Sequence, residues 1–294
     1  MNIQERHIVP IQSTPIRLQD YAVGIFQTAS TKSAVKKAIK KELVLVNGEL
    51  ASTAQFLRGN EEIVLLEATS KHKHFDLDLN VLFEDEYLAI IYKPAGVSVS
   101  GNSFATIDNA LSQNLQHSPQ KDAVKPRPVH RLDYPTSGLL LIGKTSSSIL
   151  QLSKLFENKE IQKTYHAVTI GKTERQGEIS LPVDGKESLS EFQVLHTVNS
   201  ERFDFLNLVK LSPKTGRRHQ LRKHLSAIGN PILGDKDYGK ENLILKGKGL
   251  YLHASNLEFV HPFTLVKMKI NSPLPMKFLK LFPEMTSLKQ QSFA

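Results

Sequence analysis

The chain has 294 residues and a mass of 33.0 kDa, enough for about two domains with a buried core. Hydrophobic residues make up 40% of the chain and charged residues 23%, close to the globular average, which excludes disordered and fibrous architectures. A surplus of 38 Lys and Arg over 29 Asp and Glu gives a net charge of +9, which suits a polyanionic partner such as nucleic acid, and the lack of Cys excludes disulfides and Cys-ligated metal sites.

The N-terminal segment, residues 1–20, lacks the continuous apolar core of a secretory signal. No run of about 18 apolar residues follows it, so the sequence predicts no membrane span. We therefore expect a cytoplasmic protein.

Residues 32–41 are predicted to form a cationic amphipathic helix. Their apolar side chains recur at helical spacing on one face, and Lys36, Lys37 and Lys40 lie outside that face. On charge alone, a solvated helix face and an RNA-binding face are equally good interpretations of these lysines.

A hairpin is predicted next. Residues 43–46 form its first strand and residues 49–50 its second, because Asn47-Gly48 tolerates the positive φ of a tight hairpin turn. Residues 62–67 supply another strand. Helix, strand and turn in this order resemble the small RNA-binding module named after a ribosomal small-subunit protein, which lays a basic helix along the RNA backbone.

This resemblance makes Lys36, Lys37 and Lys40 candidates for RNA binding. The module often opens with Arg-Leu-Asp, whereas this chain has Arg17-Leu-Gln-Asp20.

A polar linker is predicted over residues 69–80, which show no helical periodicity. We place the domain boundary near Asp76, with the N-terminal tail, module and linker in residues 1–75 and a second domain in residues 76–294. His72 and His74 lie in this linker between lysines, where solvated histidines are more common than metal ligands.

The second domain is predicted to be α+β, with a largely antiparallel mixed sheet flanked by helices and loops, because strands and helices do not alternate regularly. The predicted strands are residues 87–92, 139–142, 165–170, 205–209 and 265–270, and the predicted helices are residues 146–158 and 219–228.

One stretch matches the pattern of a phosphate-binding loop, from Gly138 through Gly143-Lys-Thr145. Such a loop wraps its backbone N–H groups around phosphates, but here four bulky aliphatic residues separate the glycines and indicate a buried strand. No later strand ends in the Asp that would hold magnesium. The sequence therefore disfavours an NTPase that uses a nucleotide cofactor.

Asp133 is the candidate reactive group. It lies in a loop bounded by Pro and Gly just before a predicted strand, and such loops often carry reactive side chains. The alternative for a lone Asp is a turn residue or the partner of the adjacent Arg131.

Several ordered motifs surround Asp133. His130-Arg-Leu-Asp133 with residues 136–141 closely resembles the signature of RluA-type pseudouridine synthases. Further segments resemble other motifs of that family, in the family's order, and cover about residues 82–270. These segments are residues 92–96, 163–171, 215–229, 231–235, 238–239, 252–254 and 259–262.

The resemblance implies an RNA uridine isomerase that needs no cofactor. Uridine loses its bond from ring nitrogen to sugar, turns while held, and reattaches through ring carbon 5. In the family the Asp matched by Asp133 is essential and acts covalently on either the uridine or its sugar. Arg222 would pair with Asp133 and keep it ionised. The alternative for Arg222 is a surface arginine that binds phosphate.

Other roles follow from the same resemblance. Tyr165 would stack on the flipped base and assist removal of the carbon 5 proton, although a Tyr in a strand is usually a core residue. Arg131 would fill the stack that the base leaves, or else form a structural ion pair. Arg217 and Arg218 would bind RNA, and Arg218 stands where the family commonly has Thr.

The expected partner is structured ribosomal or transfer RNA. The histidines show no spacing with carboxylates that indicates a metal site, and the family uses no metal. The rival interpretation is a non-catalytic RNA-binding or ribosome-assembly protein on the same fold. The sequence assigns no oligomeric state.

Overall fold

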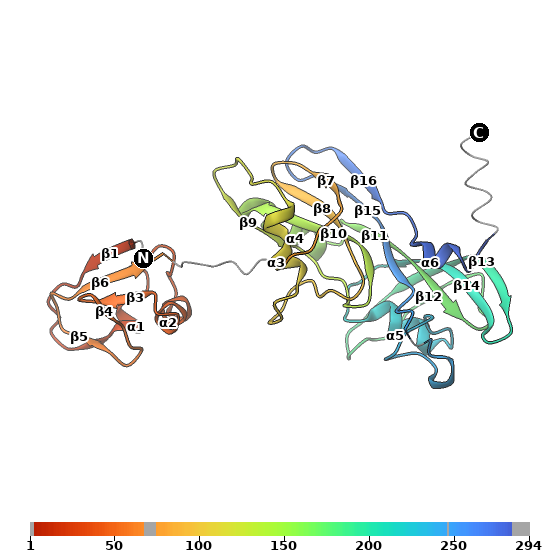
Figure 1. Cartoon of the computed structure of the whole chain (residues 1–294), viewed down its shortest axis with the longest axis horizontal. Helices are drawn as coiled ribbons and strands as arrows, with labels where there is room; N and C mark the ends of the chain where they lie inside the picture. The colour runs from red at the N-terminus through yellow and green to blue at the C-terminus, as the bar shows by residue number, and fades with distance from the viewer. Residues whose placement is uncertain (1–2, 68–74, 246, 284–294) are drawn as a thin grey trace. The chain divides into compact units, whose positions relative to one another are not determined.

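The computed structural model describes residues 3–67, 75–245 and 247–283. The chain divides into two compact units, Met1–His72 and Lys73–Ala294. In Figure 1 the first unit is red to orange and the second runs from orange through yellow and green to blue. Within the described residues, no helix combines the length and the apolar character needed to cross a membrane.

The first unit is built on an antiparallel sheet in the order β1-β6-β3-β4. Asn47 and Gly48 connect β3 to β4 with φ values of 51° and 84°, as the hairpin prediction requires. The strands of this unit are β1 (Ile3–Ile8), β2 (Ile16–Arg17), β3 (Val44–Val46), β4 (Glu49–Leu50), β5 (Phe56–Leu57) and β6 (Glu62–Leu66), with β2 paired to β5.

The predicted basic helix is confirmed as α2 (Lys32–Lys40), which follows the short α1 (Leu18–Tyr21). Thr31 caps α2 by accepting a hydrogen bond from the Ala34 N–H at 3.2 Å. Val35 and Ile39 are buried in the core of this unit. This packing orients the helix so that its lysines stay exposed.

The second unit contains a ten-stranded sheet whose main order is β12-β13-β14-β11-β15-β10-β8-β7, with β16 beside β15 and β9 beside β10. The mixed, largely antiparallel α+β prediction is confirmed. The strands are β7 (Val81–Glu84), β8 (Leu88–Lys93), β9 (Ala123–Pro128), β10 (Ser137–Thr145), β11 (Gln162–Ile170), β12 (Gln176–Ile179), β13 (Ser190–Ser200), β14 (Asp204–Pro213), β15 (Leu252–Val260) and β16 (Lys267–Asn271).

The central strand β10 is buried on both faces. Leu140 and Ile142 pack in one hydrophobic cluster, whereas Leu139 and Leu141 pack in another. This explains the continuous apolar run between the glycines. Lys144 donates from Nζ to Glu84 Oε1 and to the Asp85 carbonyl, both at 2.6 Å. Its ammonium is therefore bound within the protein and not directed at a phosphate. The segment that matches a phosphate-loop pattern is thus a core strand.

β10 and β15 pair in parallel, whereas the other named strand pairs in the described residues are antiparallel. The contact joins Ser137 to His253 and Gly138 to Ala254. Gly138 has φ +121°, and a Cβ there would collide with the Ala254 backbone. Glycine is therefore required at this crossing, directly after the loop that carries Asp133.

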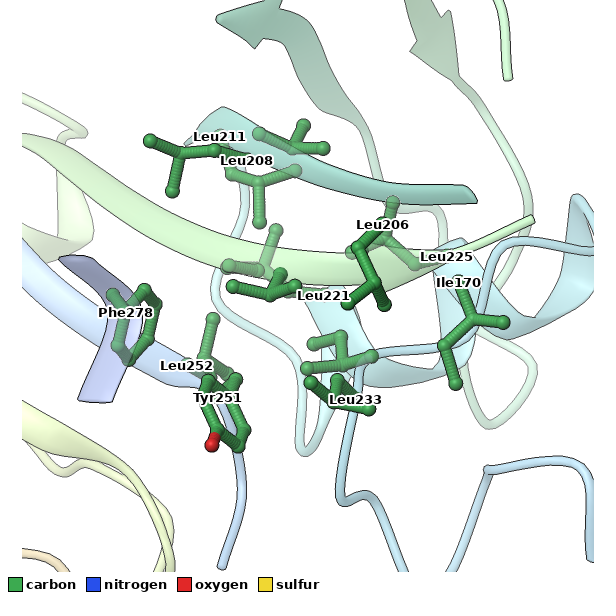
Figure 2. Close-up of a cluster of buried hydrophobic side chains, with 14 of the residues drawn as sticks. Ile170, Leu206, Leu208, Leu211, Leu221, Leu225, Leu233, Tyr251, Leu252 and Phe278 are labelled. Atoms are coloured by element: carbon green, nitrogen blue, oxygen red, sulfur yellow. The ribbon is translucent and has the colours of Figure 1, made fainter. Parts of the chain in front are cut away.

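Helices cover the sheet at different places. Residues of α3 pack in the cluster with Leu140, and Leu152 of α4 packs in the cluster with Leu139. Figure 2 shows Leu221 and Leu225 of α5 beside Leu206 and Leu208 of β14. The helices are α3 (Ile107–Asn114), α4 (Ser146–Glu157), α5 (Gln220–Ala227) and α6 (Met276–Leu279), with a 3₁₀ helix at Glu241–Leu243.

Two boundaries differ from the prediction for a local reason. The strand predicted over residues 265–270 begins at Lys267, because Leu265 lies in a turn with φ 58°. The helix predicted from His219 begins at Gln220, because His219 is its N-cap with φ 55°. Arg217 and Arg218 therefore precede α5 and lie in the loop that leads to it.

Candidate active site

Asp133 lies in the loop between β9 and β10. The neighbouring Leu132 is buried and anchors the loop in the core, and the Thr136 N–H donates to the Asp133 carbonyl at 3.0 Å. The Asp133 side chain is 22% exposed. Its carboxylate is therefore held at the surface of a rigid framework, within reach of a substrate.

Lys93, at the end of β8, holds this loop in place through hydrogen bonds to its backbone carbonyls. Its side chain is fully buried, and Nζ donates to the carbonyls of Pro94, Tyr134 and Thr136 at 2.9, 3.3 and 2.7 Å. Burial lowers the pKa of Lys93 to about 8, against the opposing effect of Asp133. Lys93 lies in the motif at residues 92–96, but its contacts with these three carbonyls have no signal in the sequence.

Arg222 of α5 is the buried cation of the site. Its Nε and Nη2 donate to the two carboxylate oxygens of Asp235 at 2.8 and 2.6 Å, and Nη2 also donates to Asp237 at 2.6 Å. Burial disfavours the charged form, but the hydrogen bonds to Asp235 and Asp237 raise the pKa of Arg222 above its ordinary value. The guanidinium is therefore permanently charged and held in one orientation.

The contact predicted between Arg222 and Asp133 exists, but it is not the main ion pair of Arg222. Nη1 lies 3.7 Å from Asp133 Oδ2, whereas Asp235 is bound at hydrogen-bond distance on two nitrogens. The alternative of a surface arginine is wrong, because the Arg222 side chain is only 3% exposed. Asp235, whose side chain is fully buried, acts as the orienting partner.

His219 approaches the other carboxylate oxygen of Asp133. Its Nε2 lies 3.7 Å from Oδ1, and its Nδ1 is hydrogen-bonded to the Tyr238 hydroxyl at 2.9 Å. Burial lowers the pKa of His219, with Asp133 acting in the opposite direction. From the sequence, His219 is only one of the histidines weighed as possible metal ligands. The left-handed backbone that directs it toward Asp133 has no signal in a single sequence.

Tyr165 lies on β11, close enough to Asp133 for the two side chains to interact electrostatically. Its ring packs against two of the hydrophobic clusters. Burial, reinforced by the negative charge of Asp133, raises the pKa of the Tyr165 hydroxyl above its ordinary value. The phenol therefore stays protonated at neutral pH.

The remaining candidates of the second unit are exposed. Arg131 precedes Asp133 by two residues, and among the described residues no ion pair holds it, so the structural ion-pair alternative is not supported. Tyr134 is 60% exposed beside it. Arg217 donates from Nε to the Glu187 carbonyl at 3.2 Å, and Arg218 is exposed in the same loop.

Lys36, Lys37 and Lys40 lie on the exposed face of α2, in the first unit. His72 and His74 are outside the described residues. Within residues 3–67, 75–245 and 247–283, no group of three or more His, Asp or Glu side chains is arranged to hold a metal ion.

The arrangement combines one accessible carboxylate, one fixed cation and one aromatic ring. In the part of the chain that is described, the carboxylate oxygens of Asp133 make no short ion pair and accept no side-chain hydrogen bond. A carboxylate of this kind can attack an electrophilic carbon and leave again, and the ring can stack on a planar base.

Comparison with known proteins agrees with this geometry. Residues 87–227, which include Asp133, Tyr165 and Arg222, match the family described as RNA pseudouridylate synthase. A ribosomal large subunit pseudouridine synthase D of Nitrosomonas europaea is 32% identical to this chain, with 97% of this chain and 88% of the relative covered. A protein of the same name from Pseudomonas aeruginosa is also 32% identical, with 95% of both chains covered.

A solved human structure, RNA pseudouridylate synthase domain containing 1, has a similar fold. The TM-score is 0.56 at 25% sequence identity, and the match covers 67% of this chain and 83% of that chain. The fold and the site thus define an RNA-modifying isomerase. The chain belongs to the RNA pseudouridine synthase family, within the RluA-type branch that the sequence motifs indicated.

Proposed function

We propose that this protein converts uridines of large-subunit ribosomal RNA to pseudouridine, with Asp133 as the reacting carboxylate. The proposal rests on the surroundings of the Asp133 carboxylate. Oδ1 lies 3.7 Å from His219 Nε2 and Oδ2 lies 3.7 Å from Arg222 Nη1, and among the described residues no closer ion pair binds either oxygen. Arg222 places a fixed positive charge beside Asp133, and the carboxylate remains free to react.

The reaction is an isomerisation, so its atoms balance without a second substrate. The bond from uridine N1 to the sugar breaks, the base turns, and a bond from C5 to the sugar forms as the C5 proton leaves and N1 takes up a proton. Asp133 forms a transient covalent bond to the base or to the sugar, and that bond is broken before product leaves. A base stacked in an RNA helix must first be extruded, which costs a few kcal/mol.

The surrounding residues support this chemistry. The raised pKa of Tyr165 favours a stacking role for its ring over a role as an ionised base. Arg131, exposed and adjacent to the reactive loop, is suited to occupy the space that the extruded base leaves in the RNA stack.

The RNA class is proposed from the relatives, whose names specify the ribosomal large subunit. The first unit is proposed as an RNA-binding module, because α2 exposes Lys36, Lys37 and Lys40 next to a compact hairpin. We expect the first unit to contribute to RNA binding and not to the reaction itself, since Asp133 and its partners all belong to the second unit.

The test is tritium release from RNA labelled at uridine C5, with ribosomal and transfer RNA made without this protein as separate substrates. Wild-type protein is expected to release tritium from ribosomal RNA, and Asp133→Asn is expected to release none while it still binds that RNA. Equal release by Asp133→Asn would refute the assignment of Asp133. Release only from transfer RNA would refute the ribosomal substrate, and RNA binding without release would favour a non-catalytic binding protein.

A further inference from the structure

Lys163 of β11 is a cation for which the proposed chemistry has no use. It precedes Tyr165 by two residues, but the register of β11 against β15 shifts between Thr164 and Tyr165. Lys163 pairs with Leu257, in the cluster that contains Leu139, whereas Tyr165 pairs with Ala254, in the cluster that contains Leu140. The two positions are about 7 Å apart along the strand. Lys163 therefore lies close along the strand to the residue whose ring is proposed to hold the base.

Three segments of the site converge on this lysine. Its Nζ lies 5.9 Å from the ring centre of Phe156, at the end of α4. The Phe156 ring packs on His130 with a centroid distance of 4.6 Å, which places Lys163 near the loop of Asp133. Nζ also lies 3.8 Å from the position that a Cβ at Gly216 would occupy, in the loop that precedes α5.

No acidic partner of Lys163 lies in the described part of the chain. The lysine is partly buried, and among the described residues no carboxylate lies within 4.0 Å of its ammonium, although ion pairs of that length do hold Lys144, Lys214 and Lys223. Burial lowers the pKa of Lys163, and no negative charge offsets this effect. Placing an ammonium here costs stability that a neutral side chain would not cost.

A bound anion would remove that cost. The loops next to His130 and Gly216 carry the exposed cations Arg131, Arg217 and Arg218, whereas the end of α4 beside Phe156 carries both Lys154 and Glu157. Every nucleotide of an RNA strand carries a phosphate on each side, so a base held against Tyr165 brings a phosphate close to this position.

We propose that the Lys163 ammonium binds a backbone phosphate of the RNA beside the target uridine. This inference rests on the proposed function, since the phosphate reaches Lys163 only when a uridine enters the site at Asp133. Lys163 is a positioning residue: it fixes the strand on which the base is extruded, and it does not touch the reacting atoms.

The test compares Lys163→Met with Lys172→Met in the full-length protein. Met retains the length and apolar stem of lysine and removes its charge. Lys172 follows β11 at its other end and is exposed, so it is a matched control for the loss of one positive charge. The probe is unmodified large-subunit ribosomal RNA labelled with tritium at uridine C5.

Lys163→Met is expected to weaken RNA binding about tenfold at physiological salt. It should also reduce the slope of log affinity against log salt by about 0.7 to 0.9, the effect of one lost phosphate contact. At saturating RNA, its single-turnover tritium release should stay within about threefold of wild type. Lys172→Met should match wild type in all these measurements.

Thermal unfolding separates this role from a structural one. Because Lys163 is desolvated and unpaired, Lys163→Met should unfold at the same temperature as wild type or higher. An unchanged salt slope in Lys163→Met, or an equal reduction in Lys172→Met, would overturn the proposal while wild-type tritium release still upheld the proposed function. Absence of wild-type release from this RNA would instead count against the proposed function, and with it the proposal.

Discussion

The two carboxylates that bind Arg222 are equally close to it but differ in exposure. Both lie 2.6 Å from Nη2, yet the Asp235 side chain is 0% exposed and that of Asp237 is 59% exposed. Removing one partner of a buried ion pair leaves an unpaired charge in the interior. When one partner of an exposed pair is removed, water solvates the remaining charge. Distance alone therefore does not tell which of these two contacts contributes more to the free energy of unfolding.

We expect Asp235→Asn to lower the free energy of unfolding by about 3 kcal/mol, because it leaves the Arg222 guanidinium without its buried counter-charge. Asp237→Asn, the matched control, should cost about 1 kcal/mol or less. Urea unfolding measures both values. Equal losses in the two variants would show that the buried pair does not determine the orientation of Arg222.

At this scale the sequence predicted some residues and missed others for physical reasons. Asp133 and Arg222 lie in ordered motifs, so the sequence names both as candidates, and the structure brings their side chains to 3.7 Å of each other. The role of Asp235 was missed because its contact with Arg222 depends on how the chain folds back after α5. Lys93 was missed because nothing in a sequence distinguishes a buried lysine that donates to three carbonyls from an exposed one.

Among the elements, the crossing of β10 and β15 positions the reactive loop. Gly138→Ala would place a methyl group against the Ala254 backbone at a residue with φ +121°. We expect a loss of about 3 kcal/mol or more in the free energy of unfolding, since strain and collision add.

Gly185→Ala is the control for that prediction. Gly185 has φ +73°, but a Cβ there would contact nothing within 4 Å, so the variant carries only the conformational strain. We expect this variant to lose about 1 kcal/mol in the free energy of unfolding, as measured by chemical denaturation. If Gly138→Ala were no worse than Gly185→Ala, the close approach of the two strands would not be needed for stability.

Elements with a strong local signal were predicted correctly. The apolar run of β10 and the amphipathic pattern of α2 both reflect burial that the sequence records directly. β13 was not predicted, because polar residues such as Glu191, Gln193 and Asn199 interrupt its apolar residues. Its conformation comes from the long pairing with β14, which is a tertiary contact.

For the whole molecule, we expect removal of residues 1–72 to affect binding more than chemistry. Phe75 is retained in this variant, because Gln113 Nε2 donates to its carbonyl at 2.9 Å and it packs in the core of the second unit. RNA affinity should fall, and its salt slope should decrease by up to about 2 to 3 if Lys36, Lys37 and Lys40 each bind a phosphate.

Filter binding across a salt series measures the affinity of this shortened protein, and single-turnover tritium release at saturating RNA measures its chemistry. The single-turnover rate should remain close to that of the full chain. Unchanged affinity and an unchanged salt slope would contradict an RNA-binding role for the first unit.

The contact between Ser137 and His253 joins residues that are 116 positions apart. During protein synthesis, β10 therefore leaves the ribosome long before its parallel neighbour β15 exists. Arg222 and its partners Asp235 and Asp237 also emerge well after Asp133. Because domains fold as their contacts become available, the nascent chain cannot assemble its reactive loop until translation of the second unit is nearly complete. The fold thus delays completion of the site around Asp133 until the last strands of the second unit have been made.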